Sequence, residues 1–365
     1  MEITCGFIGL GLIGGSIAKA LKQNRNDIVI YAYDKNPDTL RLASEEGIAD
    51  LIFDRIDPAF SRCNIIFLCA PVSHNDDNLL LLKEYLGKDC ILTDVGSVKT
   101  DIHNHISVLG LDSVFIGGHP MAGSERFGYP NSKAELLENA YYILTPTKQT
   151  SPEQLDFYKN LVLSTKAIPL ILSYEEHDYF TAGISHLPHV IASSLVNLVR
   201  EADTKDGIMK MIAAGGFKDI TRIASSSPEM WQQICLTNKE NLSSLLECYI
   251  KMLFDIKKEI DSGNQEAIYR FFDSARQYRD SFINASSGPI KKVFSLNIDI
   301  ADKPGAIAAV ATMMAEHNIS IKNIGIVHNR EYEEGAMQIE FYEESGMISA
   351  TALLAENGYS IHKKN

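Results

Sequence analysis

Cysteine, tryptophan and positive charge are scarce in this sequence. Its 365 residues include six cysteines and one tryptophan, and 34 Lys and Arg stand against 47 Asp and Glu, a formal net charge of −13. No two cysteines form a C-x-x-C pair, which favours buried thiols in a reducing compartment over a disulfide framework. The negative charge disfavours nucleic-acid backbones and anionic membranes as partners, so an acidic metabolite would need local cations.

Long hydrophobic runs are missing as well. No apolar stretch approaches the length of a bilayer crossing, and the first residues enter a strand pattern instead of a basic, cleavable leader. We therefore expect a cytoplasmic protein. With 45% hydrophobic and 22% charged residues, a chain of this length has enough apolar material for two or three domains.

A glycine-rich turn follows an apolar run at 3–8 and precedes a helical pattern. Strand, G-x-G-x-x-G and helix together are typical of a dinucleotide site, because the glycines permit a tight turn and close approach of the backbone to a pyrophosphate. The N–H groups at the helix start then face the anion. The residues expected to bind the cofactor here are Gly9, Gly11, Leu12, Ile13 and Gly14.

The identity of the dinucleotide is indicated by Asp34. It ends the next apolar run, at 28–33, and lies 20 positions after Gly14. A carboxylate there accepts hydrogen bonds from an adenosine ribose and repels a 2′-phosphate. The pattern therefore favours NAD, although Lys35 and Arg41 leave NADP open.

Residues 1–172 alternate short apolar runs with helical patterns, which predicts a Rossmann-type, doubly wound and mostly parallel sheet. The runs lie at 3–8, 28–33, 65–72, 90–95, 113–117, 141–145 and 167–172. Ligands of such sheets bind beyond the carboxyl ends of the strands. We therefore expect Ala70 and Pro71 beside the cofactor.

Strand patterns disappear over 173–287, where we expect an all-helical domain for substrate binding and dimerisation. Thr237 and Glu240 predict a T-x-x-E capping box, an apolar stripe follows it, and Gly263 is expected to end that helix. Residues 285–289 predict a linker. From 292 to 365 the order β-α-β-β-α-β predicts a ferredoxin-like domain.

Two residues are candidates for acid–base chemistry. His119 is expected in a Gly- and Pro-rich loop after a parallel strand, where the nicotinamide end of a dinucleotide should lie, and an imidazole can take the proton of an alcohol that loses hydride. Ser97, at the neighbouring strand end, could bind the same hydroxyl. A helix-capping role for Ser97 and a backbone-bonded role for His119 remain open.

Candidate substrate ligands lie in the helical region. His186 and His189 share a helix face, and Pro188 predicts a kink between them. No third ligand stands at a suitable spacing, so we expect no metal there. Arg222 follows a pair of glycines and is suited to bind a carboxylate, although pairing with a neighbouring acid is equally open.

These motifs resemble those of prephenate dehydrogenases. The segments that carry the resemblance are Gly9–Ser16, Asp94–Lys99, Gly117–Glu125, Ser185–His189 and Thr221–Ala224, in that order, while the chain after 292 resembles an ACT domain. The resemblance implies oxidative decarboxylation of prephenate to 4-hydroxyphenylpyruvate with NAD⁺, in tyrosine biosynthesis, by a homodimer. Where family members carry Lys-Ser-Gly, this chain has Arg126-Phe127-Gly128, a difference at the implied entrance.

The resemblance also implies roles for individual residues. His119 would polarise or deprotonate the ring hydroxyl with help from Ser97, while His189 and Arg222 would hold the substrate. Ser124 and the acidic gate residue Glu125 would lie at the entrance, and Trp231 close to the pocket. Tyrosine is the implied effector of the ACT-like domain, and its site would include Asp302, Pro304, Gly305 and Asn323.

Two alternatives remain open at the level of sequence. One is an arogenate dehydrogenase, whose substrate carries an amine on its side chain. The other is a protein that senses NAD and an amino acid without turning over a substrate. Nothing in the residues decides between prephenate and arogenate.

Overall fold

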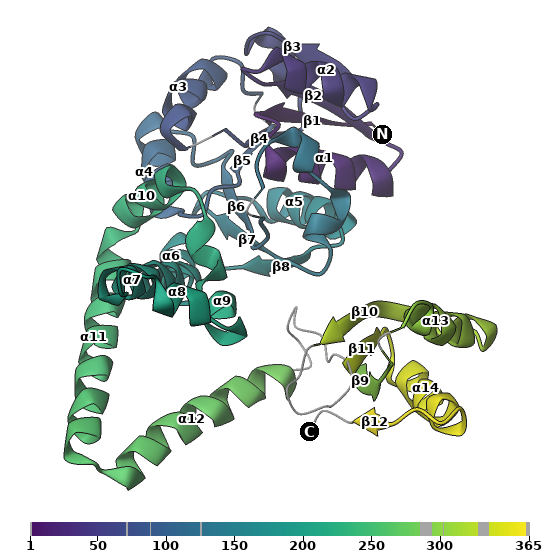
Figure 1. The fold of residues 1–365 in the computed structure, drawn as a ribbon. Coiled ribbons are helices and arrows are strands. Elements are labelled where there is room, and N and C mark those ends of the chain that lie inside the picture. The colour runs from purple at the N-terminus through teal and green to yellow at the C-terminus, as the bar shows by residue number, and fades with distance from the viewer. Residues whose placement is uncertain are drawn as a thin grey trace. The chain divides into compact units, whose positions relative to one another are not determined.

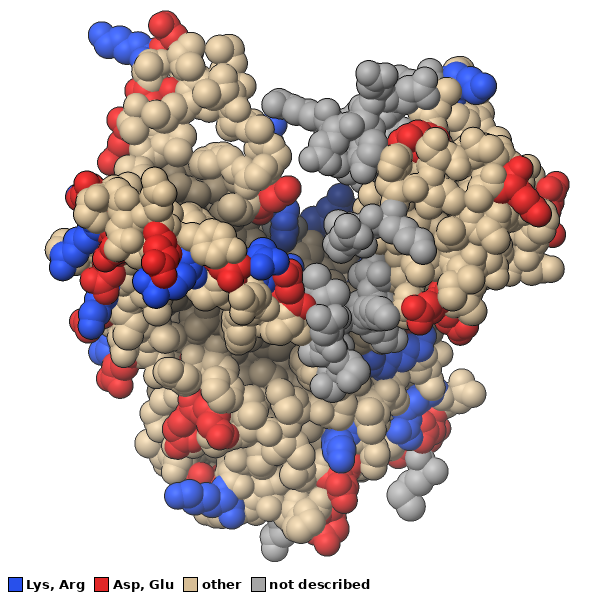
Figure 2. All heavy atoms as spheres, turned by 90° about the horizontal axis from the view of Figure 1, so that it is seen from below, with Lys and Arg blue, Asp and Glu red and all other residues tan. Residues whose placement is uncertain are grey.

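The computed structural model describes residues 2–70, 72–87, 89–124, 126–284, 294–301, 303–327 and 336–362. The chain forms two compact units, Met1–Gly263 and Asn264–Asn365 (Figure 1). Each unit is described by itself below. On the face drawn in Figure 2, acidic and basic side chains of the described residues alternate, and neither sign gathers into an extended patch.

The first unit contains a five-stranded parallel sheet in the order β3-β2-β1-β4-β5. Its strands are β1 (Ile3–Ile8), β2 (Ile28–Tyr33), β3 (Leu51–Phe53), β4 (Ile65–Leu68) and β5 (Ile91–Asp94). Reversal of the strand order on the two sides of β1 confirms the predicted Rossmann-type fold. The short edge strand β3 is an addition to that prediction.

Helices cover both faces of this sheet, since its strands are apolar on both sides. One face packs against α1 (Leu12–Asn24), α2 (Pro37–Glu45) and α5 (Pro152–Ser164), and the other against α3 (Val72–Lys83) and α4 (Thr100–Leu109). Alternation along the strands divides the two cores. In β4, Ile65 and Phe67 face the α1 side, while Ile66 and Leu68 face the α4 side.

The chain departs from the predicted single sheet after β5. Strands β6 (Ile116–Pro120), β7 (Tyr141–Pro146) and β8 (Ile168–Ile171) form a separate sheet in which β6 and β7 are antiparallel. The reason is the connection: two short turns, η2 (Tyr129–Asn131) and η3 (Ala134–Leu137), replace the crossover helix that a parallel neighbour requires.

The rest of the first unit is helical, as expected. It comprises α6 (Tyr174–Thr181), a π-helical turn η4 (Ala182–His186), α7 (Leu187–Ala202), α8 (Ile208–Ile212), α9 (Gly215–Thr221), η5 (Arg222–Ser225), α10 (Pro228–Thr237) and α11 (Lys239–Ser262). Gly263 ends α11 with φ +67°, as predicted. The π-helical turn lies immediately before Pro188, where the sequence predicted a kink.

The predicted capping box at Thr237 and Glu240 is wrong. The Thr237 hydroxyl donates to the carbonyl of Gln233 at 2.9 Å, one turn back inside α10. Asn238 stands between α10 and α11 instead, and its side chain makes no capping bond. That side chain instead reaches the Asp178 carbonyl, with 2.7 Å between nitrogen and oxygen.

Large apolar side chains are exposed along the helical region of this single chain. They include Ile184, Leu198, Ile250, Met252, Leu253, Phe254 and Ile260. Among the described residues, one helical run, Tyr174–Ala202, is long and apolar enough to cross a membrane by length and composition alone, which the sequence analysis did not expect. Within the first unit this same run carries His177, His186 and His189, three histidines of the candidate active site.

The second unit contains α12 (Gln265–Asn284) and then the β-α-β-β-α-β order expected from sequence. Its elements are β9 (Phe294–Asp299), α13 (Ala306–Glu316), β10 (Ile321–Val327), β11 (Ala336–Phe341), α14 (Glu344–Glu356) and β12 (Ile361–His362). The sheet order is β10-β11-β9-β12, with antiparallel neighbours. Leu296 and Ile298 of β9 pack with Met314 and Leu354 from the two helices. The expected linker at 285–289 lies outside the described residues.

Gly15, next to the cofactor glycines, is a packing site. A Cβ atom there would lie 2.7 Å from both the Ser132 hydroxyl and a ring carbon of Tyr129. The Tyr129 ring cannot easily move, because its hydroxyl donates to Glu46 at 2.8 Å and Lys19 lies over its face. The β6–β7 connection is thereby fastened to α1.

We expect Gly15→Ala to lower the free energy of unfolding by about 1–3 kcal/mol through overpacking. Urea denaturation of the full chain measures this. The control is Gly216→Ala in α9, where a Cβ would have no atom within 4 Å and Gly→Ala favours a helix. Equal stability of Gly15→Ala and wild type would contradict the packing argument.

Candidate active site

The glycine loop between β1 and α1 has the geometry of a pyrophosphate cradle. Gly9 has φ +99°, and a Cβ there would lie 2.8 Å from the backbone nitrogen of Ala70. A Cβ on Gly14 would lie 2.6 Å from the Gly9 carbonyl, whereas one on Gly11 would meet nothing within 4 Å. Backbone packing thus requires two of the glycines, and the third leaves open space before the N-terminus of α1.

Gly11 is the N-cap of α1, so Leu12 and Ile13 present the first N–H groups of the helix. Asp34 lies beside this loop and accepts hydrogen bonds from the backbone of Leu10 at 2.7 Å and of Asn36 at 2.8 Å. Each carboxylate oxygen can accept more than one hydrogen bond, so the carboxylate can still receive a ribose hydroxyl. The loop therefore fits a dinucleotide.

Arg41, which left NADP open at the level of sequence, is engaged elsewhere. Its guanidinium pairs with Asp38 at 3.3 Å and Glu45 at 3.1 Å along α2. These pairs are exposed and weak, but they hold the side chain along its own helix. The predicted contact Pro71 lies outside the described residues.

His119 lies within strand β6, which corrects the expectation of a loop position. It is opposite Ile143 of β7, and the strand ends at Pro120. Pairing with β7 extends the strand through a Gly-Gly-His-Pro sequence of weak strand propensity. His119 is buried, with 8% of its surface exposed, so its ring has a fixed environment.

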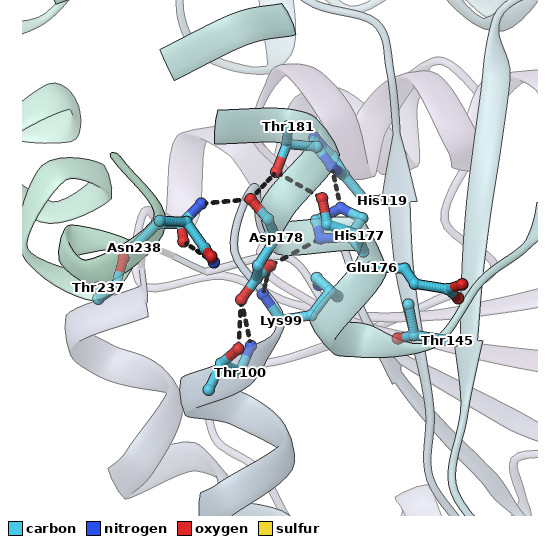
Figure 3. Close-up of polar contacts among 12 residues, drawn as sticks. Lys99, Thr100, His119, Thr145, Glu176, His177, Asp178, Thr181, Thr237 and Asn238 are labelled. Atoms are coloured by element: carbon cyan, nitrogen blue, oxygen red, sulfur yellow. Dashed lines mark hydrogen bonds and ion pairs between the residues drawn. The ribbon is translucent and has the colours of Figure 1, made fainter. Parts of the chain in front are cut away.

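A second histidine and a carboxylate extend from the His119 ring (Figure 3). His119 Nδ1 lies 2.7 Å from His177 Nε2, and His177 Nδ1 lies 2.7 Å from Asp178 Oδ1. Asp178 also accepts the backbone N–H groups of Lys99 and Thr100, each at 2.8 Å. The three side chains form one hydrogen-bonded chain from α6 to β6.

Burial and hydrogen bonding shift the pKa values of these three side chains. Burial lowers the pKa of His119 well below its usual value, and the nearby His177, Lys99 and His186 act in the same direction. Burial also lowers the pKa of His177 against the opposing bond to Asp178. Burial alone would raise the pKa of Asp178, but the hydrogen bonds from His177, Thr100 and Lys99 outweigh it and lower that pKa.

A buried ion pair supports the strands beneath these residues. Lys99 is fully buried, pairs with Asp94, and donates to the Gly118 carbonyl at 2.8 Å. Asp94 in turn accepts the backbone N–H of Gly96 at 2.9 Å. Ser97 is half-buried between Gly96 and Lys99, whose bonds to Asp94 anchor this segment on both sides of it.

His186 has a defined tautomer. Asn238 donates from Nδ2 to the Asp178 carbonyl at 2.7 Å, and the same nitrogen lies 3.1 Å from His186 Nδ1. Because a carbonyl only accepts, the amide nitrogen must face it, so His186 Nδ1 accepts and Nε2 carries the hydrogen. Burial lowers the pKa of His186 to about 4. Among the described residues, its Nε2 has no hydrogen-bond partner.

The predicted substrate ligands His189 and Arg222 lie in the helical region, on α7 and at the start of η5. The Trp231 ring stacks on His189 at 3.7 Å between centroids and meets His186 edge-on at 6.0 Å. His189 Nδ1 lies 2.9 Å from the Ser185 carbonyl and therefore donates to it. Burial lowers the pKa of His189 against the opposing hydrogen bond to Ser185, and the charge of Arg222 acts in the same direction as burial. Trp231, His186 and His189 thus form one aromatic cluster, which Asn238 joins to the backbone of Asp178.

Other predicted residues are less defined by contacts. Ser124 is exposed and accepts the backbone N–H of Arg126 at 3.1 Å, while Glu125 lies outside the described residues. In the second unit, Pro304 and Gly305 are exposed at the start of α13, with φ +89° at Gly305, and Asn323 is exposed on β10. Asp302 lies outside the described residues.

Sequence reasoning missed the roles of His177, Asp178 and Asn238. The adjacent His-Asp pair follows a Ser173–Glu176 capping box at the start of α6, and two ionisable residues directly after a helix start were an available signal. Asn238 carried no signal, because its partners are 60 and 52 residues away along the chain.

Two family models match the chain. Residues 17–169 match the prephenate dehydrogenase nucleotide-binding domain, and residues 173–274 match the prephenate dehydrogenase dimerization domain. The chain belongs to the prephenate dehydrogenase family. The fold and the arrangement of the glycine loop, His119 and the helical domain agree with this membership.

Named relatives span most of the chain. The prephenate dehydrogenase of Bacillus subtilis (strain 168) is 36% identical over 349 residues, 94% of this chain and 93% of the relative. The crystal structure of prephenate dehydrogenase from A. aeolicus, in complex with hydroxyphenyl propionate and NAD⁺, is similar with a TM-score of 0.72 and 33% identity, covering 77% of this chain and 99% of that one. The crystal structure of Synechocystis arogenate dehydrogenase is similar with a TM-score of 0.69 and 30% identity, and the match covers 77% of this chain and 100% of that one.

The cofactor preference of this family member can be tested at Asp34. We expect Asp34→Asn to reduce the ratio of kcat/KM for NAD to that for NADP by at least about tenfold, because repulsion of a 2′-phosphate is lost. Steady-state kinetics with both cofactors measures the ratio. Arg41→Ala is the matched control and should leave the ratio unchanged, because Arg41 pairs within α2. An unaltered ratio in Asp34→Asn would show that this carboxylate does not select the cofactor.

Proposed function

We propose that this family member catalyses oxidative decarboxylation of prephenate to 4-hydroxyphenylpyruvate, with His119 as the base. The chain is an NAD-dependent oxidoreductase of the prephenate dehydrogenase family. The observation that carries the assignment of the base is the neutral, buried His119 ring, which is hydrogen-bonded through Nδ1. Its Nε2 atom is the nitrogen left to bind the substrate hydroxyl.

NAD⁺ supplies the acceptor for the hydride that leaves C4 of the prephenate ring. His119 takes the proton of the C4 hydroxyl as the carbon–oxygen double bond forms. Cleavage of the bond between C1 and its carboxylate then releases CO₂, and the electron pair of that bond makes the ring aromatic. His119 returns its proton to the phenolate oxygen, so the protein gains no net proton.

The remaining residues position the substrate. Ser97 binds the same ring hydroxyl, and the Asp94–Lys99 pair holds its segment in place. Arg222 binds a carboxylate through its planar fork, with His189 beside it. His189 donates through Nδ1 to a carbonyl, so a carboxylate bound at Nε2 would favour its protonated form. Ser124 and Glu125 belong to the entrance.

Arogenate is the alternative substrate, favoured by the 30% identity to the Synechocystis arogenate dehydrogenase. Both substrates share the ring hydroxyl and ring carboxylate, so the same His119 chemistry applies. Arogenate differs in carrying an amine on the side chain. Measuring kcat/KM for both substrates with the purified chain decides between them.

Family membership also suggests the domain organisation and the oligomeric state. We propose three functional domains: 1–172 for the dinucleotide, 173–287 for substrate and dimerisation, and 292–365 as an ACT-like regulatory domain that binds tyrosine. The match of 173–274 to a dimerization domain and the exposed apolar side chains of α11 support a homodimer. The β-α-β-β-α-β order supports the ACT-like domain. We place the protein in the cytoplasm.

The central test follows NADH absorbance on mixing the chain with NAD⁺ and prephenate. Wild type should produce NADH, and His119→Asn should reduce kcat by about two to four orders of magnitude with little change in KM. Because the pKa of His119 is lowered, its neutral form persists as the pH falls, so the acid limb of kcat/KM should lie below pH 6.5. Binding of NAD⁺ and prephenate without turnover by wild type would indicate a sensor instead of an enzyme.

Regulation is tested by ending the chain after Asn284. The match to the A. aeolicus structure covers 99% of that chain but only 77% of this one. We therefore expect the catalytic unit to fold without the C-terminal region. We expect the shortened chain to keep its activity and to lose inhibition by tyrosine. Inhibition that persists in the shortened chain would place the tyrosine site in the catalytic unit.

A further inference from the structure

We propose that Asp178 and His177 are positioning residues that fix the tautomer of His119, so that the Nε2 atom of His119 always reaches the substrate as a hydrogen-bond acceptor. This inference rests on the proposed role of His119 as the base. It assigns a function to two residues that lie behind the catalytic ring and do not contact the reacting atoms.

The direction of the hydrogen bonds begins at the carboxylate. An ionised carboxylate only accepts, so His177 must donate from Nδ1 to Asp178 Oδ1, across 2.7 Å. Neutral His177 then has a lone pair on Nε2, which lies 2.7 Å from His119 Nδ1. His119 must therefore donate from Nδ1, and the lone pair of the neutral His119 ring stands on Nε2.

Asp178 is suited to be the fixed end of this chain. Its two oxygens also accept the backbone N–H groups of Lys99 and Thr100 and the hydroxyl of Thr100 (Figure 3). All these partners are donors, so the carboxylate remains an acceptor. Both His177 and Asp178 are fully buried, so water does not compete for the ring nitrogens.

The chain also offsets the charge that forms during the reaction. When His119 receives the hydroxyl proton it becomes an imidazolium, in a site where Lys99 and His186 from two other elements oppose positive charge. Asp178, one imidazole away, and Asp94, which pairs with Lys99, are the acids that face these rings, and both favour positive charge on His177. No proton has to reach Asp178, because each ring keeps its own hydrogen bond throughout.

The test replaces His177 and leaves Asp178 to cap α4. His177→Phe keeps an aromatic ring at this position but offers no hydrogen bonds, and we expect kcat to fall roughly 10- to 1,000-fold while KM for prephenate changes little, because the tautomer of His119 is no longer fixed. The acid limb of kcat/KM should move to lower pH, since the protonated His119 ring loses the acceptor for its Nδ1 hydrogen. His177→Gln should recover part of kcat, because its amide oxygen can accept from His119 Nδ1.

The matched control is His103→Gln. His103 is also buried in this unit, and its Nε2 lies 2.9 Å from the Thr145 hydroxyl, outside the His119 chain. We expect this variant to lose stability without any change in the acid limb. Equal kcat losses in His177→Phe and His177→Gln, with an unmoved acid limb, would overturn the proposal and leave His177 with a packing role.

A spectroscopic readout separates this proposal from the proposed function. In protein labelled with ¹⁵N-histidine, the His119 ring signals are identified by their loss in His119→Gln, and no substrate is needed. Wild type should show hydrogen on Nδ1 only, and His177→Phe should show a mixture of both tautomers. Hydrogen on Nε2 of His119 in wild type would overturn the inference whether or not the chain oxidises prephenate.

Discussion

The buried carboxylate of Asp178 is the constraint on which the catalytic region depends. A charge taken out of water is costly unless donors surround it. The donors to Asp178 are the backbone N–H groups of Lys99 and Thr100, at the start of α4, and the ring of His177. These three hydrogen bonds are 2.7–2.8 Å long. A single group therefore joins the start of α4, in the nucleotide-binding fold, to α6, the first helix of the helical region.

The neighbouring interactions extend this constraint to the strands. Lys99 connects through its side chain to Asp94 and to the Gly118 carbonyl, and through its backbone to Asp178. The segment that contains Ser97 and the strand that contains His119 are thus fixed against each other by fully buried groups. The cofactor loop is rigid for a different reason, since its glycines pack backbone against backbone. The reacting parts are consequently held by the scaffold before any ligand arrives.

Local patterns explain what could be predicted from sequence. The glycine loop, Asp34 and the helix end at Gly263 depend on residues close together in the chain, so spacing alone located them. The antiparallel pairing of β6 with β7 depends on how a long connection folds back, which hydrophobic periodicity does not report. Periodicity also does not report the contacts of Asn238, whose partners are distant in sequence, or the hydrogen bonds that join His119, His177 and Asp178. These contacts form only when α6 packs against the sheet.

The π-helical turn at Ala182–His186 has a consequence for the geometry of the whole substrate region. Its hydrogen bond runs from the N–H of Leu187 to the carbonyl of Ala182, which accommodates one residue more than an α-helical turn. An additional residue rotates everything after it by about 100° around the helix axis. Without that residue, His189 would be rotated around the helix axis relative to His177 by about 100°, more than a quarter of a turn. The histidines before and after the π-helical turn would then face different directions. The π-helical turn thus determines which side chains of α6 and α7 lie on the same face.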